Sequence, residues 1–346
     1  VALAAGLNKA ARNHILIRDT SALEQMRNVD VVVFDKTGTL TEGHPTVIGW
    51  LWAQGQEEHY KDVLLAAEST SDHPLAEAIV TALEGEEQVI PAHLDGFENI
   101  TGKGVRVAYQ GAEYWVGSHK LLKDYQANLS DILADMLTQY ESDGNSIVYF
   151  GRENDLLAVI AIKDQLRVTS MEAIRELRTQ DIEICMLTGD GERTASSVAG
   201  SLGIMRFMAD AMPDDKEDFI HKLQLQGKTV AMVGDGVNDA QALSCADVSI
   251  AMGKGTDTLM DTAMITLRTS DLLLLPKVFR LSRQTVSLMY RNLFWAFIYN
   301  TVGIFVAAGV LYPVYDILLS PALAGAAMAL SCVSVALSSL RLSSRF

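Results

Sequence analysis

The feature that most constrains this chain is a short polar run, DKTGTLT at residues 35–41, which directly follows the apolar residues 31–34. An apolar run of this kind is typical of a buried strand, and open α/β sheets place their chemistry at the carboxyl ends of such strands. Asp35 would therefore stand at the tip of a strand. A carboxylate in that position can act as a nucleophile and form an aspartyl-phosphate, which splits one difficult transfer into two easier steps.

Charge and cysteine content exclude several classes of protein. The 346 residues carry a formal net charge of −15, which argues against a nucleic-acid partner because no basic face is offered to phosphates. Cys185, Cys245 and Cys332 are widely spaced and form no CxxC pair, so neither a disulfide framework nor a zinc site is expected. The length is sufficient for two or three domains.

The pattern of strands and helices predicts a sheet that is interrupted and then resumes. Between residue 44 and about 158, a helical stretch over 60–83 is followed by short strand-like pieces with many glycines, which indicates an α+β insertion. The other expected strands cover 156–162, 182–187, 229–233 and 247–251, and the expected helices cover 168–180, 193–202, 214–226 and 239–244. Repeated strand–helix units fold as a doubly wound parallel sheet.

Groups able to hold a phosphate follow the expected strands. Thr188, Gly189 and Asp190 come directly after the strand over 182–187, where a hydroxyl and backbone amides can meet phosphate oxygens. Lys216 begins an expected helix and can balance the phosphate charge. Each of these alone has a structural explanation, as a helix cap or a solvated charge, but their order along the chain favours a phosphoryl-transfer site.

Groups able to hold a metal follow the strand over 229–233. Asp235 is a hard ligand suited to Mg²⁺. Asp239 could support the ion, and Asn238 could donate a hydrogen bond to the phosphate.

The order of these elements resembles the haloacid-dehalogenase-like superfamily, and DKTGTLT resembles the phosphorylation motif of its ion-pumping branch, the P-type ATPases. The resemblance implies ATP hydrolysis with Asp35, Lys36 and Thr37 as catalytic residues, and Mg²⁺ held by Asp35, Thr37 and Asp235. Phosphatases of the superfamily usually place a second Asp where Thr37 stands here. Without that base the phosphoenzyme should persist, which favours a pump.

Three positions depart from the pattern of the P-type ATPases. Gln165 and Gln241 stand where Pro is usual, and Gly191 stands where Asn is usual. A nucleotide-binding remnant or regulator without transport therefore remains open, and so does a membrane-tethered phosphatase of the same superfamily.

The insertion is the expected nucleotide-binding domain. His73 in the run SDHP, with Glu68 five residues before it, resembles the adenine-binding signature of the heavy-metal-transporting subgroup. Gly102 and Gly104 resemble its companion glycine loop, where missing side chains let the backbone approach a nucleotide. A structural histidine at a helix start is the alternative for His73. The resemblance extends to Asp164 and Arg167, which match a further family motif that we assign to the nucleotide site.

Two uncharged stretches near the end of the chain, residues 293–311 and 317–340, predict a transmembrane helical hairpin. Arginines before the first stretch and after the second place both ends in the cytoplasm. We expect a multi-pass membrane protein with cytoplasmic catalytic domains, lipid being one of its partners. A buried hairpin of a soluble protein is the alternative.

Polar and sulfur-containing side chains at mid-depth of these stretches are candidate ligands of a transported ion. They are Tyr299, Asn300, Met328, Ser331 and Cys332. Sulfur selects soft ions such as Cu(I), although packing between helices would also explain these residues. The pattern resembles the last two helices of Cu⁺-exporting ATPases; a second Ser is usual where Cys332 stands, so Ag⁺ is a further candidate.

The resemblance divides the chain into five parts. They are the end of a membrane helix and the first part of the phosphorylation domain (1–43), the nucleotide-binding domain (44–158), the rest of the phosphorylation domain (159–275), a linker (276–291), and two membrane helices with a tail (292–346). This corresponds to the C-terminal part of a pump. We expect further N-terminal membrane helices and an actuator domain as partners, and predict that this chain cannot pump alone.

Overall fold

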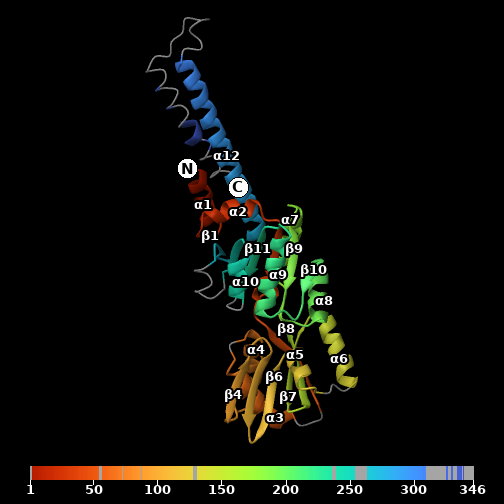
Figure 1. Ribbon diagram of the computed structural model, residues 1–346. Coiled ribbons are helices and arrows are strands. Elements are labelled where there is room, and N and C mark those ends of the chain that lie inside the picture. The colour runs from red at the N-terminus through yellow and green to blue at the C-terminus, as the bar shows by residue number, and fades with distance from the viewer. Residues whose placement is uncertain are drawn as a thin grey trace.

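The computed structural model describes residues 2–53, 57–71, 73–86, 88–127, 131–235, 239–253 and 263–308, together with 325, 329, 333–336 and 338. These residues form an elongated molecule (Figure 1). One sheet lies at the centre, a second sheet lies at one end, and the long helix α12 (Leu274–Ala307) projects from the other end.

The central sheet delivers Asp35 to the middle of one edge. Its seven strands run in the order β1 (Ile15–Ile17), β13 (Ile265–Leu267), β12 (Val248–Met252), β11 (Val230–Gly234), β2 (Val31–Asp35), β9 (Glu183–Leu187) and β10 (Arg206–Met208). All neighbours are parallel except β1, which is antiparallel to β13. β2 pairs in parallel with both β11 and β9, so its carboxyl end lies between theirs. Every residue of β2 is buried.

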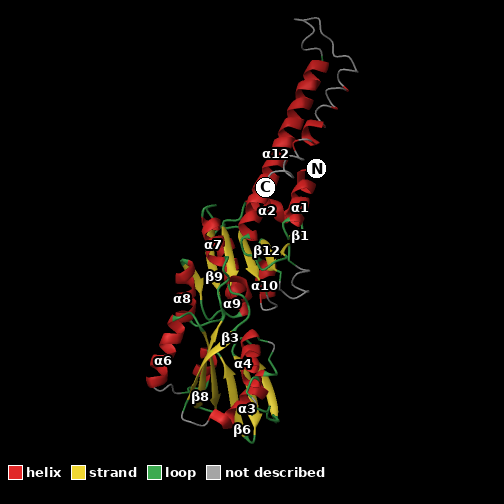
Figure 2. Cartoon of the chain, turned by 180° about the vertical axis from the view of Figure 1, so that it is seen from behind, coloured by secondary structure: helices red, strands yellow, loops and turns green. Residues whose placement is uncertain are grey.

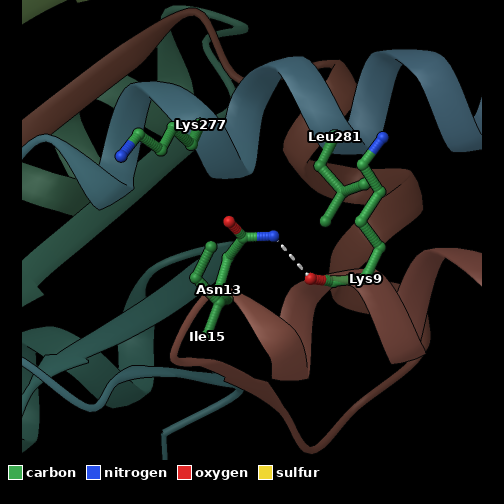
Figure 3. A pocket seen from close by; sticks show the side chains of 5 residues that line it. All are labelled: Lys9, Asn13, Ile15, Lys277 and Leu281. Atoms are coloured by element: carbon green, nitrogen blue, oxygen red, sulfur yellow. Dashed lines mark hydrogen bonds between the residues drawn. The ribbon is translucent and has the colours of Figure 1, made fainter. Parts of the chain in front are cut away.

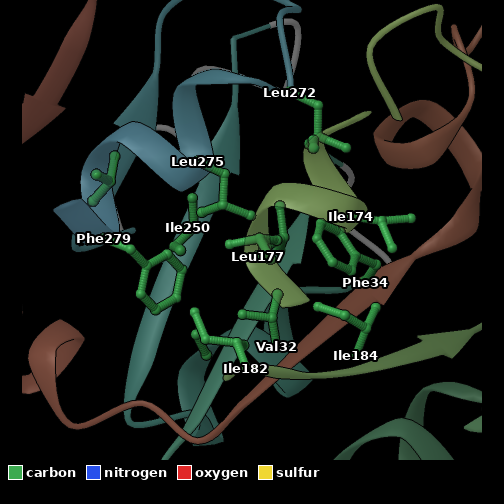
Figure 4. Packing of buried hydrophobic residues seen from close by; sticks show 14 of the residues in the cluster. Val32, Phe34, Ile174, Leu177, Ile182, Ile184, Ile250, Leu272, Leu275 and Phe279 are labelled. Carbon is green, nitrogen blue, oxygen red and sulfur yellow. The ribbon is translucent and has the colours of Figure 1, made fainter. Parts of the chain in front are cut away.

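Helices cover both faces of this sheet, because successive side chains of a strand point to opposite faces. Val32 and Phe34 pack with α7 (Ser170–Arg178), α8 (Glu192–Leu202) and the first part of α12 (Figure 4). Val31 and Val33 pack on the other side with α9 (Pro213–Leu225) and α10 (Ala240–Cys245). The prediction of a doubly wound parallel sheet is confirmed for six of the seven strands, and β1 departs from it because it is antiparallel.

The second sheet is inserted between β2 and α7. Its antiparallel strands run in the order β3 (Thr46–Trp52), β8 (Asp155–Lys163), β7 (Ser146–Arg152), β6 (Ala112–Gly117), β5 (Gly104–Tyr109) and β4 (Gly96–Ile100). Residues of α3 (Glu57–Glu68) and α4 (Pro74–Glu84) pack in one core of this unit, and α5 (His119–Asp124) and α6 (Asp131–Ser142) pack in another. The two connections to the central sheet meet at a bridge between Thr41 and Leu166.

Two expectations about this unit are corrected. The strand predicted over 156–162 exists as β8, but it belongs to the inserted sheet, which therefore extends past the predicted boundary at 158. The single helix predicted over 60–83 is two helices, α3 and α4. The break has a local cause, since Pro74 begins α4 and His73 caps it, and proline favours the first helical position over the interior.

The predicted linker over 276–291 is also corrected, because this segment is part of α12. It is helical because it carries a buried apolar face, with Val278, Phe279 and Leu281 packed in the core of the central sheet. The hydroxyl of Ser282 donates a hydrogen bond to the carbonyl of Leu23. This segment also contacts α1 (Ala2–Arg12) and α2 (Ser21–Arg27), so it is anchored to the sheet domain.

The predicted membrane hairpin is only partly covered by the described residues. The span over 293–311 is described up to residue 308, as the outer part of α12, and most of the span over 317–340 lies outside the described residues. Within the described part of the chain, none of the helices combines the length and the hydropathy that a membrane crossing needs.

Candidate active site

The site is at the edge of the central sheet rather than in the small recess shown in Figure 3. That recess lies where α1, β1 and α12 meet, and its lining includes none of the predicted site residues. Asn13 Nδ2 donates a hydrogen bond of 2.8 Å to the carbonyl of Lys9 there, which secures the end of α1. We therefore assign the recess to packing.

Three carboxylates meet at the carboxyl ends of β2 and β11. One oxygen each of Asp35, Asp235 and Asp239 lies within 4.8 Å of the others. Lys216, at the start of α9, reaches the same point, with its Nζ 2.6 Å from Asp35 Oδ1 and 2.7 Å from Asp239 Oδ1. The structure thus brings together four of the predicted site residues from separate strands and helices, whereas Asn238 lies outside the described residues.

The electrostatics of this cluster favour a bound cation. Burial, and after it the charge of Asp35, raises the pKa of Asp235 to about 7. Burial and Asp35 also raise the pKa of Asp239, against the opposing effect of Lys216. Burial disfavours the charge on Lys216, but Asp35 and Asp239 outweigh it and raise its pKa. Three carboxylates facing one ammonium group form an oxygen-rich, electron-rich site, which fits the ligand preference of Mg²⁺.

A second ion pair lies beside the cluster. Lys36 pairs with Asp190 and also donates a hydrogen bond of 3.1 Å to Ser146 Oγ. Burial opposes ionisation of Asp190, but Lys36 lowers its pKa below the ordinary value. Thr188 Oγ1 donates to Asp190 Oδ2 at 2.8 Å, and a Cβ placed on Gly189 would lie 3.7 Å from the carbonyl oxygen of Ala211. The predicted phosphate-binding loop is therefore held next to Lys36.

The loop after Asp35 has a conformation that only glycine permits at one position. Gly38 has a φ of +70°, and a Cβ there would lie 1.5 Å from Asp235 Oδ2. The missing side chain lets Asp235 approach the loop closely. Thr37, two residues after Asp35, is half-buried and supplies a hydroxyl where phosphatases of the superfamily carry a carboxylate.

Asp164 and Arg167 hold this loop from behind. Asp164 accepts a hydrogen bond from the Thr41 hydroxyl and another, of 3.1 Å, from the backbone N–H of Gly43. Arg167 Nε donates to the carbonyl of Thr39 at 2.9 Å, and a second nitrogen donates to the carbonyl of Gly38. Their contacts are thus with the phosphorylation loop. The predicted part of these two residues in nucleotide binding stays a prediction.

Glu68 and His73 lie at facing ends of consecutive helices. Ser71 links them, because its N–H donates to the Glu68 carbonyl at 3.0 Å and its Oγ accepts from the His73 N–H at 3.3 Å. Burial raises the pKa of Glu68 to about 7. Desolvation lowers the pKa of the His73 imidazole, and the negative charges of Asp190 and Asp35 oppose this effect. The imidazole is therefore close enough to the catalytic carboxylates for their charges to affect its pKa.

The two predicted glycines have different surroundings. Gly102 has a φ of +68°, and a Cβ there would lie 2.8 Å from Cε of Met212, the residue that caps α9. Gly104 has a φ of +145°, and a Cβ there would lie 2.1 Å from the carbonyl oxygen of Val116 on the neighbouring strand. Strand pairing therefore requires a glycine at position 104. At position 102 the missing side chain allows the inserted domain to pack closely against Met212 of the sheet domain.

Direct contacts join the two domains around the site. Besides the bond from Lys36 to Ser146, Thr194 Oγ1 donates to the carbonyl of Asn145 at 2.7 Å. The ammonium group of Lys120 donates to the carbonyl of Asp210. Sequence reasoning did not find Asn145 or Ser146. The sequence at Gly144 indicates only a turn before a strand. The role of Asn145 and Ser146 depends on contacts with residues more than forty positions away along the chain.

Comparison with known proteins assigns the family. A family model described as haloacid dehalogenase-like hydrolase matches residues 29–247. The chain belongs to this family.

Relatives of this haloacid dehalogenase-like chain are P-type ATPases. It is 42% identical over 337 residues to a copper-exporting P-type ATPase of Legionella pneumophila, covering 97% of this chain and 46% of the relative. It is 43% identical over 342 residues to a silver exporting P-type ATPase of Salmonella typhimurium, covering 98% and 41%. The chain spans less than half the length of these curated relatives.

Solved structures give the same result. A zinc-transporting PIB-type ATPase in the E2.Pi state matches with a TM-score of 0.68 and 35% identity, over 99% of this chain and 54% of that one. The catalytic domain of the CPx-ATPase CopB-B matches with a TM-score of 0.65 and 28% identity, over 79% and 97%. The predicted resemblance to heavy-metal-transporting P-type ATPases is confirmed.

The candidate ligands of a transported ion are not assembled within the described part of this haloacid dehalogenase-like chain. Tyr299 and Asn300 are consecutive residues of α12, and the Tyr299 ring stacks on Trp295 with 5.7 Å between ring centroids. Met328, Ser331 and Cys332 lie outside the described residues.

Proposed function

We propose that this chain is the catalytic portion of a pump that uses ATP to export a soft monovalent metal ion, with Cu⁺ as the leading candidate and Ag⁺ as the next. The observation that carries the proposal is the position of Asp35 at the tip of the central strand, paired with Lys216 and close to Asp235. The copper- and silver-exporting relatives support the choice of ion.

In the proposed reaction a carboxylate oxygen of Asp35 attacks the γ-phosphorus of ATP and ADP leaves. Lys216 is already 2.6 Å from Asp35 Oδ1, so its positive charge needs little rearrangement to stabilise the negative charge that develops on the phosphoryl oxygens. Mg²⁺, for which Asp35, Asp235 and Thr37 offer oxygen ligands, would supply further positive charge when bound. The hydroxyl of Thr188 can turn from Asp190 to a phosphoryl oxygen.

Hydrolysis of the phosphoenzyme requires a base that we assign to another part of the pump. Thr37 replaces the carboxylate that would activate water in a phosphatase, and a positioned general base typically contributes 10²–10⁴-fold to the rate. The phosphoenzyme would therefore persist in this chain alone. This supports an actuator domain as a partner.

We propose that Glu68, His73 and the loop at Gly102 bind the adenine end of ATP. A carboxyl group with a pKa of about 7 is substantially protonated at neutral pH, so Glu68 can donate as well as accept a hydrogen bond. His73→Gln should weaken ATP binding about tenfold in isothermal titration, since a good hydrogen bond or stacking contact contributes ~1.4 kcal/mol. The exposed His93→Gln is the matched control, and equal affinities in both variants would remove His73 from the site.

We propose that the outer half of α12 and residues 317–340 enter a lipid bilayer, with the catalytic domains on the cytoplasmic side. Large apolar side chains on this half are solvent-exposed, among them Leu293 (68%), Phe297 (69%) and Ile304 (68%). Apolar side chains gathered on one segment mark a surface that is covered in the working protein. Tyr299, Asn300, Met328, Ser331 and Cys332 would then lie at membrane depth as ligands of the ion.

The test of the catalytic proposal is phosphorylation of the chain by γ-labelled ATP and Mg²⁺, followed by an acid quench. We expect acid-stable, hydroxylamine-labile label that Asp35→Asn abolishes. The matched control is Asp155→Asn, an exposed Asp at the start of β8, which should leave the label unchanged. ATP binding without label would favour a nucleotide-binding remnant, and steady phosphate release from small phosphoesters would favour a phosphatase.

A further inference from the structure

A second group of metal-ligating side chains lies on the surface formed by α9 and α10, outside the catalytic cluster. Glu217, His221 and Cys245 each offer one ligand atom, and these three atoms lie within 4.8 Å of one another. Glu217 and His221 are four residues apart on α9 and therefore share a face. Cys245 is the last residue of α10, which packs against α9.

The separation of the ligand atoms suits a tetrahedral ion. His221 Nε2 is 3.5 Å from Glu217 Oε1, and two ligands bonded to a tetrahedral Zn²⁺ at their usual bond lengths stand about 3.4 Å apart. The Cys245 sulfur completes the group, within 4.8 Å of the ligand atoms of Glu217 and His221. An ion could therefore bind with only small side-chain rotations.

Gln224 fixes the tautomer that metal binding requires. Its amide nitrogen donates to the carbonyl of Cys245 at 2.9 Å and to Asp247 Oδ2 at 3.2 Å. This orientation turns its Oε1 toward His221 Nδ1, at 3.1 Å, so Nδ1 carries the proton. In the neutral imidazole, Nε2 then offers its lone pair on the side of Glu217. Metal-ligating histidines commonly donate their other ring N–H in this way.

The donor types and the exposure select the class of ion. A thiolate, an imidazole and a carboxylate match the ligands of Zn²⁺, whereas Mg²⁺ and Ca²⁺ prefer oxygen alone. The His221 and Glu217 side chains are 50% and 35% exposed, which gives the ion access and leaves a fourth position for water. A surface ion pair would explain Glu217 and His221, but it would not explain the convergent thiol or the orientation of Gln224.

We propose that Glu217, His221 and Cys245 form a Zn²⁺ site in which Gln224 is a positioning residue. Spacing along the sequence predicted no zinc site, because the ligands come from two helices. The ion would join α9 to α10, and both helices begin at the catalytic cluster. Lys216 is adjacent to Glu217, and Asp239 caps α10. Occupancy of this surface site would therefore restrain the helices that carry Lys216 and Asp239.

The test is titration of the full chain, in a thiol-free reductant, with Co²⁺ as a spectroscopic substitute for Zn²⁺. We expect a thiolate-to-cobalt charge-transfer band at one equivalent, which Zn²⁺ then removes by displacement. Cys245→Ser should abolish the band and His221→Ala should weaken Co²⁺ binding at least tenfold. The catalytic carboxylates offer no sulfur and cannot produce this band. Cys185→Ala, at a buried cysteine of β9, is the matched control and should retain it.

Gln224→Leu tests the positioning role separately. We expect 10–100-fold weaker Co²⁺ binding, the usual effect of removing a partner of a ligating histidine. The control Gln226→Leu changes the same residue type on the exposed end of α9 and should leave the affinity unchanged. The proposal is overturned if the unaltered chain shows no such band, or if the band survives Cys245→Ser or is indifferent to His221→Ala.

Discussion

Gly38 and Asp235 show how one missing side chain can determine the geometry of a catalytic site. The Asp235 carboxylate occupies the space that a Cβ on residue 38 would fill, at 1.5 Å from that position. An alanine would have to move either the carboxylate or the backbone that follows Asp35. The contact therefore connects the nucleophile loop to the proposed Mg²⁺ ligand without any hydrogen bond.

Gly38→Ala should reduce the yield of acid-stable phosphoenzyme at least tenfold. The backbone strain itself is matched by Gly111→Ala, because Gly111 has a φ of +77° and no atom within 4 Å of a Cβ placed there. Both variants should lose about 1 kcal/mol of stability from the left-handed backbone, but Gly111→Ala should be phosphorylated normally. Equal phosphorylation of the two variants would show that the contact with Asp235 does not matter.

The raised pKa of Asp235 predicts a pH-dependent stability. The pKa of Asp235 is about 7 in the folded chain, whereas an unperturbed Asp, as in the unfolded chain, has a pKa of 3.8. Between these two pH values the folded state therefore binds more protons than the unfolded state. The free energy of unfolding therefore falls as the pH rises from about 4 to 7. The difference between 3.8 and about 7 corresponds to at most ~4 kcal/mol.

Without divalent ions, Asp235→Asn should therefore be more stable than the unaltered chain, by about 2–4 kcal/mol at pH 8 and roughly half of that at pH 5. Urea unfolding in EDTA, followed by circular dichroism at both pH values, measures this. Mg²⁺ should stabilise the unaltered chain more than the variant. A stability difference that is the same at pH 5 and pH 8 would contradict the assignment.

At the scale of elements, the strands were predictable where their pattern is local. β2, β9 and β11 are apolar runs that end at a chemical motif, and β12 is a further apolar run. Both the existence of these strands and the convergence of Asp35, Asp235 and Asp239 therefore followed from the sequence. In the central sheet, the edge strands β1 and β10 and the strand β13 beside β1 have only three residues each, too few to show a periodicity.

β8 was assigned to the wrong sheet for a physical reason. Residues 158–162 are buried without alternation, which is the pattern of a strand covered on both faces, as in a parallel sheet. In the inserted sheet, which is antiparallel, helices also cover both faces. The sequence of β8 alone does not reveal that its pairing partners are β3 and β7. Ser146 escaped prediction in the same way, since its bond to Lys36 joins residues 110 positions apart.

Packing of α1 on α12 gives a prediction at this scale. A Cβ on Gly6 would lie 2.7 Å from two side-chain atoms of Thr285, which is fully buried. Thr285 is β-branched and cannot easily rotate away. Gly6→Ala should therefore cost about 1–3 kcal/mol through overpacking, seen as a lower urea midpoint and faster proteolysis within α1.

The control for this prediction is Gly200→Ala in α8, where a Cβ would meet no atom within 4 Å. The same substitution should there stabilise the chain by about 0.5–1 kcal/mol, because alanine loses less conformational entropy than glycine in a helix. A gain in stability for both variants would mean that α1 does not pack on α12 as closely as the structure indicates.

At the scale of the whole molecule, the site lies between two parts that can each transmit movement to it. The inserted sheet approaches the catalytic edge from one end, and α12 leaves the opposite end of the sheet domain (Figure 2). α12 is continuous over 34 residues, and its first half is buried against the sheet domain while its outer half is exposed. A displacement of the sheet domain during phosphorylation would therefore be carried along one helix to the outer half.

Whether that outer half enters lipid can be measured through Trp295. The chain has four tryptophans, and Trp50, Trp52 and Trp115 all belong to the inserted sheet, far along the molecule from α12 (Figure 1). In vesicles containing brominated lipid, fluorescence of the chain should be partly quenched, and Trp295→Phe should abolish the quenching. Trp50→Phe removes a different tryptophan and should leave the quenching intact. Quenching that persists without Trp295, or that is absent from the unaltered chain, would refute insertion of α12, because bromine quenches only rings within the bilayer.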